Sequence, residues 1–117
     1  MSKKRNYDLF LLDIIDSIEK IEKYTKGFSQ KKFIENELIN MAVIKFYEII
    51  GEAAKNIPAE IRKLAPDIPW KNIIGFRNIV IHKYFSIDLE NVWFITKKQL
   101  PALKTQIKAL LKAIKNK

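Results

Sequence analysis

Apolar residues recur every three or four positions along most of the chain, a spacing that predicts helices. The clearest stripe lies within residues 7–24, and its members are Leu11, Ile14, Ile15, Ile18 and Ile21. Gly27 follows this stripe, as is typical of a residue that ends a helix. Ser29 is a candidate N-cap for a short helical turn that includes Phe33 and Ile34.

A second long helix is predicted for residues 37–56. We expect its inner face to carry Leu38, Met41, Ala42, Ile49 and Ala53. Pro58 should end this helix, because the residue before a proline disfavours the helical conformation. Residues 59–64 then suit a single helical turn.

Two more helices are predicted in the second half of the chain. The third should cover residues 69–83, with Asp67 as its N-cap and Pro69 in its first turn. Ser86 or Asp88 should open the last helix, which runs nearly to the end of the sequence.

Pro101 lies inside the last helix, where its ring removes one backbone hydrogen bond. We therefore expect a kink within residues 97–101. Hairpin signals such as Asn-Gly and Asp-Gly are absent, so the sequence predicts no strands. The expected fold is all-α: an up-and-down bundle of four main helices, with short extra helical turns and a kinked C-terminal helix.

Composition is consistent with one domain spanning residues 1–117. Hydrophobic residues make up 48% of the chain, enough for one core, and no repeat or linker divides it. Cysteine is absent, which excludes disulfides and thiolate metal sites. Asp8, Asp13 and Asp16 interrupt the apolar N-terminal stretch, so it does not resemble a signal peptide. We expect a soluble, cytoplasmic protein without a membrane partner.

The net charge of +9 favours an anionic partner, either nucleic acid or an acidic protein. A lysine-rich solvated surface is the simpler explanation. Of the 22 basic residues only three are arginines, namely Arg5, Arg62 and Arg77. In so lysine-rich a chain, Arg77 suggests a position that needs a guanidinium fork and not only a positive charge.

The segment GFRNIVIHKYF, residues 75–85, contains the single histidine and reads R-x4-H-x-Y from Arg77 through His82 to Tyr84. This motif resembles the signature of HEPN domains, specifically the HepT-like toxins of MntA–HepT toxin–antitoxin systems. Four segments also resemble that family, in its order: AVIKFYEIIGEAAKNIP, IRKLAPDIPWKNIIGFRNIVIHKYF, DLENVW and LPALK. The resemblance covers nearly the whole chain.

The resemblance implies a helical homodimer that cuts RNA without a metal or another cofactor. It also implies a neighbouring MNT-type nucleotidyltransferase antitoxin, which would silence the toxin by transferring AMP onto Tyr84.

The residue types of the motif suit the cleavage of RNA. Imidazole titrates near neutral pH, so His82 can act as general acid or base. Arg77 can stabilise charge on the phosphoryl oxygens. Asn78 could bond a phosphate oxygen or orient Arg77.

Helix geometry constrains this site. His82 is five residues from Arg77, which is about 140° around an ideal helix. Either the helix ends or distorts near His82, or a second chain contributes to the site. The reaction needs both a general acid and a general base, but each chain has only one histidine and so supplies only one imidazole. Both points favour a two-fold dimer with facing motifs.

The simpler interpretation of these residues is structural: His82 caps a helix or is buried for structural reasons, and Tyr84 is a core or rim aromatic.

Other charged residues are weaker candidates. Lys104, Lys108, Lys112 and Lys115 form a basic stripe. It could contact RNA or the antitoxin together with Lys83, or be a solvated helix face. Glu48 and Glu52 are one turn apart and could bind Mg²⁺, but nothing else resembles a metal site. We favour pairing of Glu52 with Arg77.

Two functions other than the nuclease remain open from the sequence. One is a non-catalytic HEPN subunit that docks on a nucleotidyltransferase and assists it. The other is a basic helical scaffold without a site. The chain lacks the Gly-Ser turn and closely spaced aspartates of a nucleotidyltransferase, so any AMP transfer requires a partner.

Overall fold

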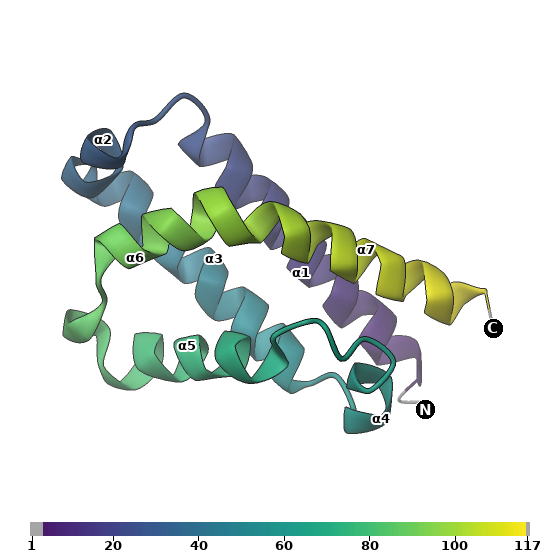
Figure 1. Ribbon diagram of the computed structural model, residues 1–117. Helices are drawn as coiled ribbons and strands as arrows, with labels where there is room; N and C mark the ends of the chain where they lie inside the picture. Colours follow the sequence, from purple (N-terminus) through teal and green to yellow (C-terminus); the bar gives the residue numbers. More distant parts are fainter. Residues whose placement is uncertain (1–3, 117) are drawn as a thin grey trace.

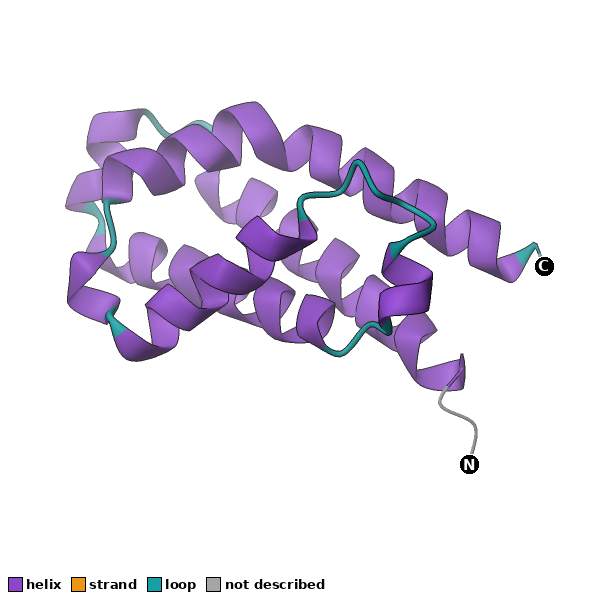
Figure 2. Ribbon diagram, turned by 60° about the horizontal axis from the view of Figure 1, so that its bottom comes forward, coloured by secondary structure: helices purple, strands orange, loops and turns teal. Residues whose placement is uncertain are grey.

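Four long helical segments run alternately up and down in the computed structural model, which describes residues 4–116 (Figure 1). They are α1 (Lys4–Thr25), α3 (Glu37–Lys55), α5 (Trp70–His82) and a last segment made of α6 (Leu89–Phe94), a π-helical turn η2 (Ile95–Gln99) and α7 (Leu100–Lys115). Short helices α2 (Gln30–Glu35), α4 (Ala59–Arg62) and the 3₁₀ turn η1 (Tyr84–Ser86) lie between them. Residues 4–116 contain no strand (Figure 2). The predicted all-α bundle of four main helices is confirmed.

The start of α1, α4 and the end of α7 lie at one end of the bundle, and α2 and the η1 turn lie at the other (Figure 1). Helix α1 packs against α3 and α7, and α3 packs against α5. The core between them is built mainly from aliphatic side chains, including Leu11, Ile14, Ile18, Ile21, Val43, Ile50, Ile57, Leu100 and Ile107. Every helix within residues 4–116 is too short or too polar to cross a bilayer.

Three helix boundaries lie where local chemistry predicts them. Gly27 has φ +78°, a left-handed conformation that glycine adopts without steric cost, and it ends the α1 turn. Ser29 is the N-cap of α2, and its Oγ accepts a 3.1 Å hydrogen bond from the Lys32 amide. Asp88 caps α6 by accepting a 3.0 Å bond from the Glu90 amide, so Asp88 and not Ser86 opens the last helix.

The predicted inner face of α3 is wrong in its first half. Leu38 is 81% exposed and Met41 is 50% exposed, whereas Ala53 is buried as expected. The side chains that α3 does bury are Asn40, Val43, Ile44, Tyr47, Ile50, Ala53 and Ala54. Helix α3 is apolar around most of its circumference because it packs against α1, α2 and α5, so its periodicity alone does not select one face.

The predicted cap of α5 is also wrong. The N-cap position is Pro69, and no side chain caps this helix. Ile68 is buried, and its carbonyl accepts a 2.8 Å bond from the Trp70 amide. This turn leaves Asp67 exposed and outside the helix. The Trp70 indole instead anchors the preceding loop by donating to the Ala65 carbonyl at 3.1 Å.

The distortion expected near Pro101 is present as the π-helical turn η2, which ends two residues before that proline. Within η2, the Thr96 hydroxyl donates to the Val92 carbonyl at 2.8 Å and accepts from the buried Tyr47 hydroxyl at 2.7 Å. This pair joins α3 to the last helical segment. Burial raises the pKa of Tyr47, so the phenol stays protonated and able to donate.

Candidate functional site

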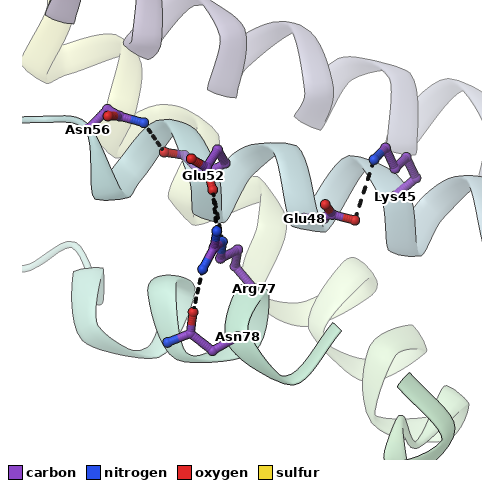
Figure 3. Close-up of polar contacts among 6 residues, drawn as sticks. All are labelled: Lys45, Glu48, Glu52, Asn56, Arg77 and Asn78. Carbon is purple, nitrogen blue, oxygen red and sulfur yellow. Dashed lines mark hydrogen bonds and ion pairs between the residues drawn. The ribbon is translucent and has the colours of Figure 1, made fainter. Parts of the chain in front are cut away.

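Arg77 lies where α5 packs against α3, and its side chain is only 17% exposed. Its guanidinium points toward α3 and meets Glu52 (Figure 3). Both Nε and Nη2 lie 2.8 Å from the same carboxylate oxygen, Oε1 of Glu52. The third contact is a 2.8 Å hydrogen bond from Nη1 to Oδ1 of Asn78. The expected pairing of Glu52 with Arg77 is thus confirmed, and Asn78 bonds the guanidinium, as one of its two suggested roles requires.

These three contacts leave part of the guanidinium available. Arginine has five N–H donors; in Arg77, Nε and Nη1 each donate one hydrogen bond, and Nη2 is ion-paired with Glu52. One N–H therefore remains on Nη1 and one on Nη2. N–H groups on the two Nη atoms of arginine commonly hold two oxygens of a phosphate. Glu52 is half exposed, so water and an arriving anion can reach this part of α3.

Helix α5 ends at His82, whose side chain is exposed. Lys83 follows with φ −139°, and its amide closes the last turn by donating to the Ile79 carbonyl at 2.8 Å. The sequence allowed two explanations for the five-residue spacing: that the helix ends near His82, or that a second chain contributes to the site. The structure shows that the helix ends at His82. Among residues 4–116 no hydrogen bond joins the imidazole to Arg77, whose polar partners are Glu52 and Asn78. Within one described chain the arginine and the histidine are therefore not hydrogen-bonded to each other.

Tyr84 lies on the η1 turn directly after the helix. The turn is closed by the Ser86 amide, which donates to the Lys83 carbonyl at 2.8 Å. Tyr84 is 38% exposed and packs edge-on against the fully exposed Phe85, with ring centres 5.8 Å apart. Lys83 is also exposed. Tyr84 is therefore not a core aromatic, whereas the reading as a rim aromatic stays open.

The basic stripe on α7 is partly engaged with α1. Lys104 Nζ lies 2.9 Å from Oε1 of Glu22 and 3.7 Å from Oε2 of Glu19, and the hydrogen bond that Lys104 donates to Glu22 raises the pKa of Lys104. Lys108 Nζ lies 3.6 Å from the same Glu19 oxygen. Lys112 is exposed and has no ion pair within the described part of the chain. Contact of this stripe with RNA stays a prediction, now stronger for Lys112 than for its neighbours.

Glu48 is separate from the arginine site. Its Oε1 lies 3.5 Å from Nζ of Lys45 on the same helix (Figure 3). Glu48 and Glu52 thus have different partners and are not a shared carboxylate pair. No cluster of three metal-ligating side chains occurs among residues 4–116.

A wide groove of about 1180 Å³ follows the outer side of α5, between α4 and α6. Its walls include the exposed apolar side chains of Ile79 and Phe94, and Asn78 also lines it. Asn78 therefore links the groove to the guanidinium of Arg77. A second, apolar pocket of about 370 Å³ lies between α3, α5 and α7 and is lined by Ile50, Phe76 and Leu103, among others.

The sequence did not identify one residue of the site, Gly51. It precedes Glu52 on α3, and a Cβ placed there would overlap the Cβ of Arg77. The available signal was a glycine in the interior of a predicted helix, where it is unfavourable unless close packing needs it.

The sequence is similar to a known protein family and to several of its members. Residues 14–110 match the family described as Ribonuclease HepT-like. The chain is 42% identical over 104 residues to "Putative RNase MJ1380" of Methanocaldococcus jannaschii, covering 89% of this chain and 95% of that protein. It is 38% identical over 109 residues to "Probable ribonuclease HepT" of Thermococcus cleftensis, covering 93% and 99%. No solved structure matches the chain significantly.

Proposed function

The chain belongs to the HepT-like ribonuclease family of HEPN proteins, and we propose that it is an endoribonuclease whose catalytic residues are Arg77 and His82. The observation that carries this proposal is the state of Arg77. Glu52 and Asn78 fix its guanidinium while each Nη keeps one free N–H. Such a fixed fork is suited to a phosphate group, the common feature of any RNA substrate.

We propose a cleavage reaction that needs no metal ion. The 2′-hydroxyl oxygen attacks the adjacent phosphorus while the bond from phosphorus to the 5′-oxygen breaks. A general base takes the 2′-proton, and a general acid gives a proton to the leaving 5′-oxygen. The products are a 2′,3′-cyclic phosphate and a 5′-hydroxyl. His82 supplies the imidazole for these transfers, and Arg77 stabilises the charge on the non-bridging oxygens.

Two chains are proposed to form one cleft. No hydrogen bond joins His82 to Arg77 within the described part of one chain, and each chain has one imidazole for two proton transfers. The groove along α5, with its exposed Ile79 and Phe94, offers an apolar surface beside Asn78 that a second copy could cover. In such a dimer one histidine can be the base and the other the acid.

Cleavage of a single-stranded RNA by purified protein tests the nuclease. His82→Ala should lose about 10²–10⁴-fold in kcat with an unchanged circular dichroism spectrum. Arg77→Lys should also be poor, because an ammonium group cannot reproduce a two-pronged contact. Activity should persist in EDTA. Full activity of His82→Ala would refute the assignment, and loss of activity in EDTA would refute the metal-independent mechanism.

Mixing inactive variants tests the shared cleft. Arg77→Ala and His82→Ala dimers, unfolded together and refolded, form mixed dimers that contain one intact arginine and one intact histidine on different chains. Because this mixed dimer carries only one imidazole, activity above that of either parent variant but well below that of the wild type would support a site shared between chains. If light scattering shows only monomers near 13.8 kDa at micromolar concentration, the dimer proposal is wrong.

The nuclease is proposed to be the toxin of a toxin–antitoxin pair. An MNT-type nucleotidyltransferase would transfer AMP from ATP to the phenol oxygen of Tyr84, releasing pyrophosphate. Tyr84 is exposed and lies two residues after His82, so its phenol is within reach of a partner enzyme. The attached phosphodiester carries a negative charge and would compete with RNA phosphate for Arg77. A nucleotidyltransferase gene beside this one would support the pairing.

The second candidate function is a non-catalytic subunit that binds and assists that nucleotidyltransferase. The exposed η1 turn supports this reading equally well, because a docking partner also needs Tyr84 to be accessible. The two functions differ in one result: a pure docking subunit cleaves no RNA in the absence of its partner.

A further inference from the structure

We propose that Gly51 is a positioning residue for Arg77, and that its lack of a side chain sets where the guanidinium lies. This inference rests on the proposed function for its catalytic meaning. A Cβ added at Gly51 would overlap Cβ of Arg77, lie 3.1 Å from Cγ of Arg77 and lie 3.0 Å from the Ile73 carbonyl oxygen. Two of these three contacts are with the first carbons of Arg77 itself.

Gly51 and Glu52 therefore hold the two ends of one side chain. The space left by Gly51 receives the aliphatic stem of Arg77, and the next residue supplies the carboxylate that binds its head. Asn78 holds the remaining nitrogen from α5. The stem is in contact with α3, and the head is held by hydrogen bonds from Nε and Nη1 and by the ion pair at Nη2, so both ends of the side chain are constrained.

Alanine at position 51 would disturb this arrangement without touching a polar group. Its Cβ cannot coexist with Cβ of Arg77, and neither atom is at the end of a flexible chain, so α3 and α5 must separate locally. Misplacing a reacting or charge-stabilising group by about 1 Å can lower catalysis about 10²-fold. Helix propensity alone would favour alanine over glycine, so any loss comes from the contact.

Gly75 offers a matched control for this change. It also lies inside a helix, α5, but a Cβ added there meets nothing within 4 Å. Gly75 lines the groove that a second copy is proposed to cover, so the midpoints are compared in monomeric protein at low concentration. There Gly75→Ala should keep or raise the unfolding midpoint, whereas Gly51→Ala should lower it. Equal effects of the two substitutions on the midpoint would contradict the steric argument.

The arginine side chain itself provides a readout that a general loss of stability would not move. The chain has three arginines, so a ¹⁵N–¹H spectrum contains three Nε–H signals. The signal missing in Arg77→Lys belongs to Arg77. In the folded Gly51→Ala protein this signal should shift and exchange with water at least tenfold faster, while the Arg5 and Arg62 signals stay. In Gly75→Ala all three should stay. An unchanged Arg77 signal in Gly51→Ala would overturn the proposal.

Kinetics give the second readout. Gly51→Ala should lower kcat for RNA cleavage about 10²-fold, and it should have little further effect when Arg77 is already alanine. Independent, multiplicative losses would show that Gly51 does not act through Arg77. If the wild-type protein cleaves no RNA, the proposed function fails, and the Nε–H signals still decide the placement of Arg77.

A folding failure of Gly51→Ala is also informative. Adding Arg77→Gly removes the Cβ that the new methyl group overlaps. The remaining 3.0 Å contact with the Ile73 oxygen needs a shift of only a few tenths of an ångström. The double variant should therefore fold. A double variant that stays unfolded would show that overlap with Cβ of Arg77 does not cause the folding failure, and it would overturn the proposal.

Discussion

Replacing Glu52 by glutamine isolates the charge of the arginine site. Glutamine keeps the length and one acceptor oxygen but removes the negative charge that faces Nε and Nη2 of Arg77 at 2.8 Å. Exposed ion pairs are worth about 0.2–1 kcal/mol, and Glu52 is half exposed. Arg77 is only 17% exposed, so the cost should lie near the upper limit, about 1 kcal/mol. For a domain of this size that lowers the melting temperature by about 4 °C.

The effect on catalysis should be larger than the effect on stability. Without its carboxylate partner the guanidinium can adopt other orientations, and a loss of about 1.4 kcal/mol of transition-state stabilisation lowers kcat about tenfold. KM should change little, because the guanidinium keeps its charge. Urea unfolding and initial rates of RNA cleavage measure the two quantities.

Glu48→Gln is the matched control, because it changes the net charge equally and lies one turn away on α3. Its partner Lys45 is 64% exposed and 3.5 Å distant, so the cost should be about 0.3 kcal/mol or less. Its cleavage rate should stay close to that of the wild type. If the two variants lose stability and activity to the same extent, Glu52 does not orient Arg77 and the reasoning is wrong.

Four further outcomes are expected. Burial raises the pKa of Tyr47, so as pH rises the unfolded chain loses the Tyr47 phenol proton before the folded chain does. The free energy of unfolding should therefore fall as pH rises above about 10, and it should fall less steeply in Tyr47→Phe. Thr96→Val should cost about 1–3 kcal/mol, more than Tyr47→Phe, because it leaves a buried hydroxyl without a partner; equal costs in urea unfolding would contradict this. Lys112→Ala should reduce the salt dependence of RNA binding by about one charge, and Lys104→Ala by less, in fluorescence titrations. Intact-mass spectrometry after incubation with the nucleotidyltransferase, ATP and Mg²⁺ should show AMP on the wild type and none on Tyr84→Phe.

The sequence predicted most helix boundaries because the residues at those boundaries act locally. A glycine with positive φ, a serine or aspartate cap and a proline each determine the conformation of their own turn, so Gly27, Ser29, Asp88 and Pro101 act as expected. The inner face of α3 was not predictable in the same way. Several helices surround α3, and which apolar side chains stay exposed, such as Leu38, depends on their arrangement.

The arginine site was predictable in part for the same reason. The motif gives Arg77, His82 and Tyr84, and pairing of Glu52 with Arg77 followed from opposite charge. Gly51 was missed because its role is a contact between α3 and α5 that no local pattern encodes. The engagement of Lys104 by Glu22 was also missed, because 82 positions separate these residues in the sequence.

The chemistry of the cut ends tests the central claim most directly. RNA cleaved by the wild-type protein in EDTA should carry 2′,3′-cyclic phosphate and 5′-hydroxyl ends, identified by mass spectrometry of a short oligonucleotide. An oligonucleotide with a single 2′-deoxy nucleotide at the cut site should resist cleavage there, and His82→Ala should give no product. Products with 5′-phosphate ends, or cleavage of the deoxy-substituted site, would contradict attack by the 2′-hydroxyl and with it the roles proposed for Arg77 and His82.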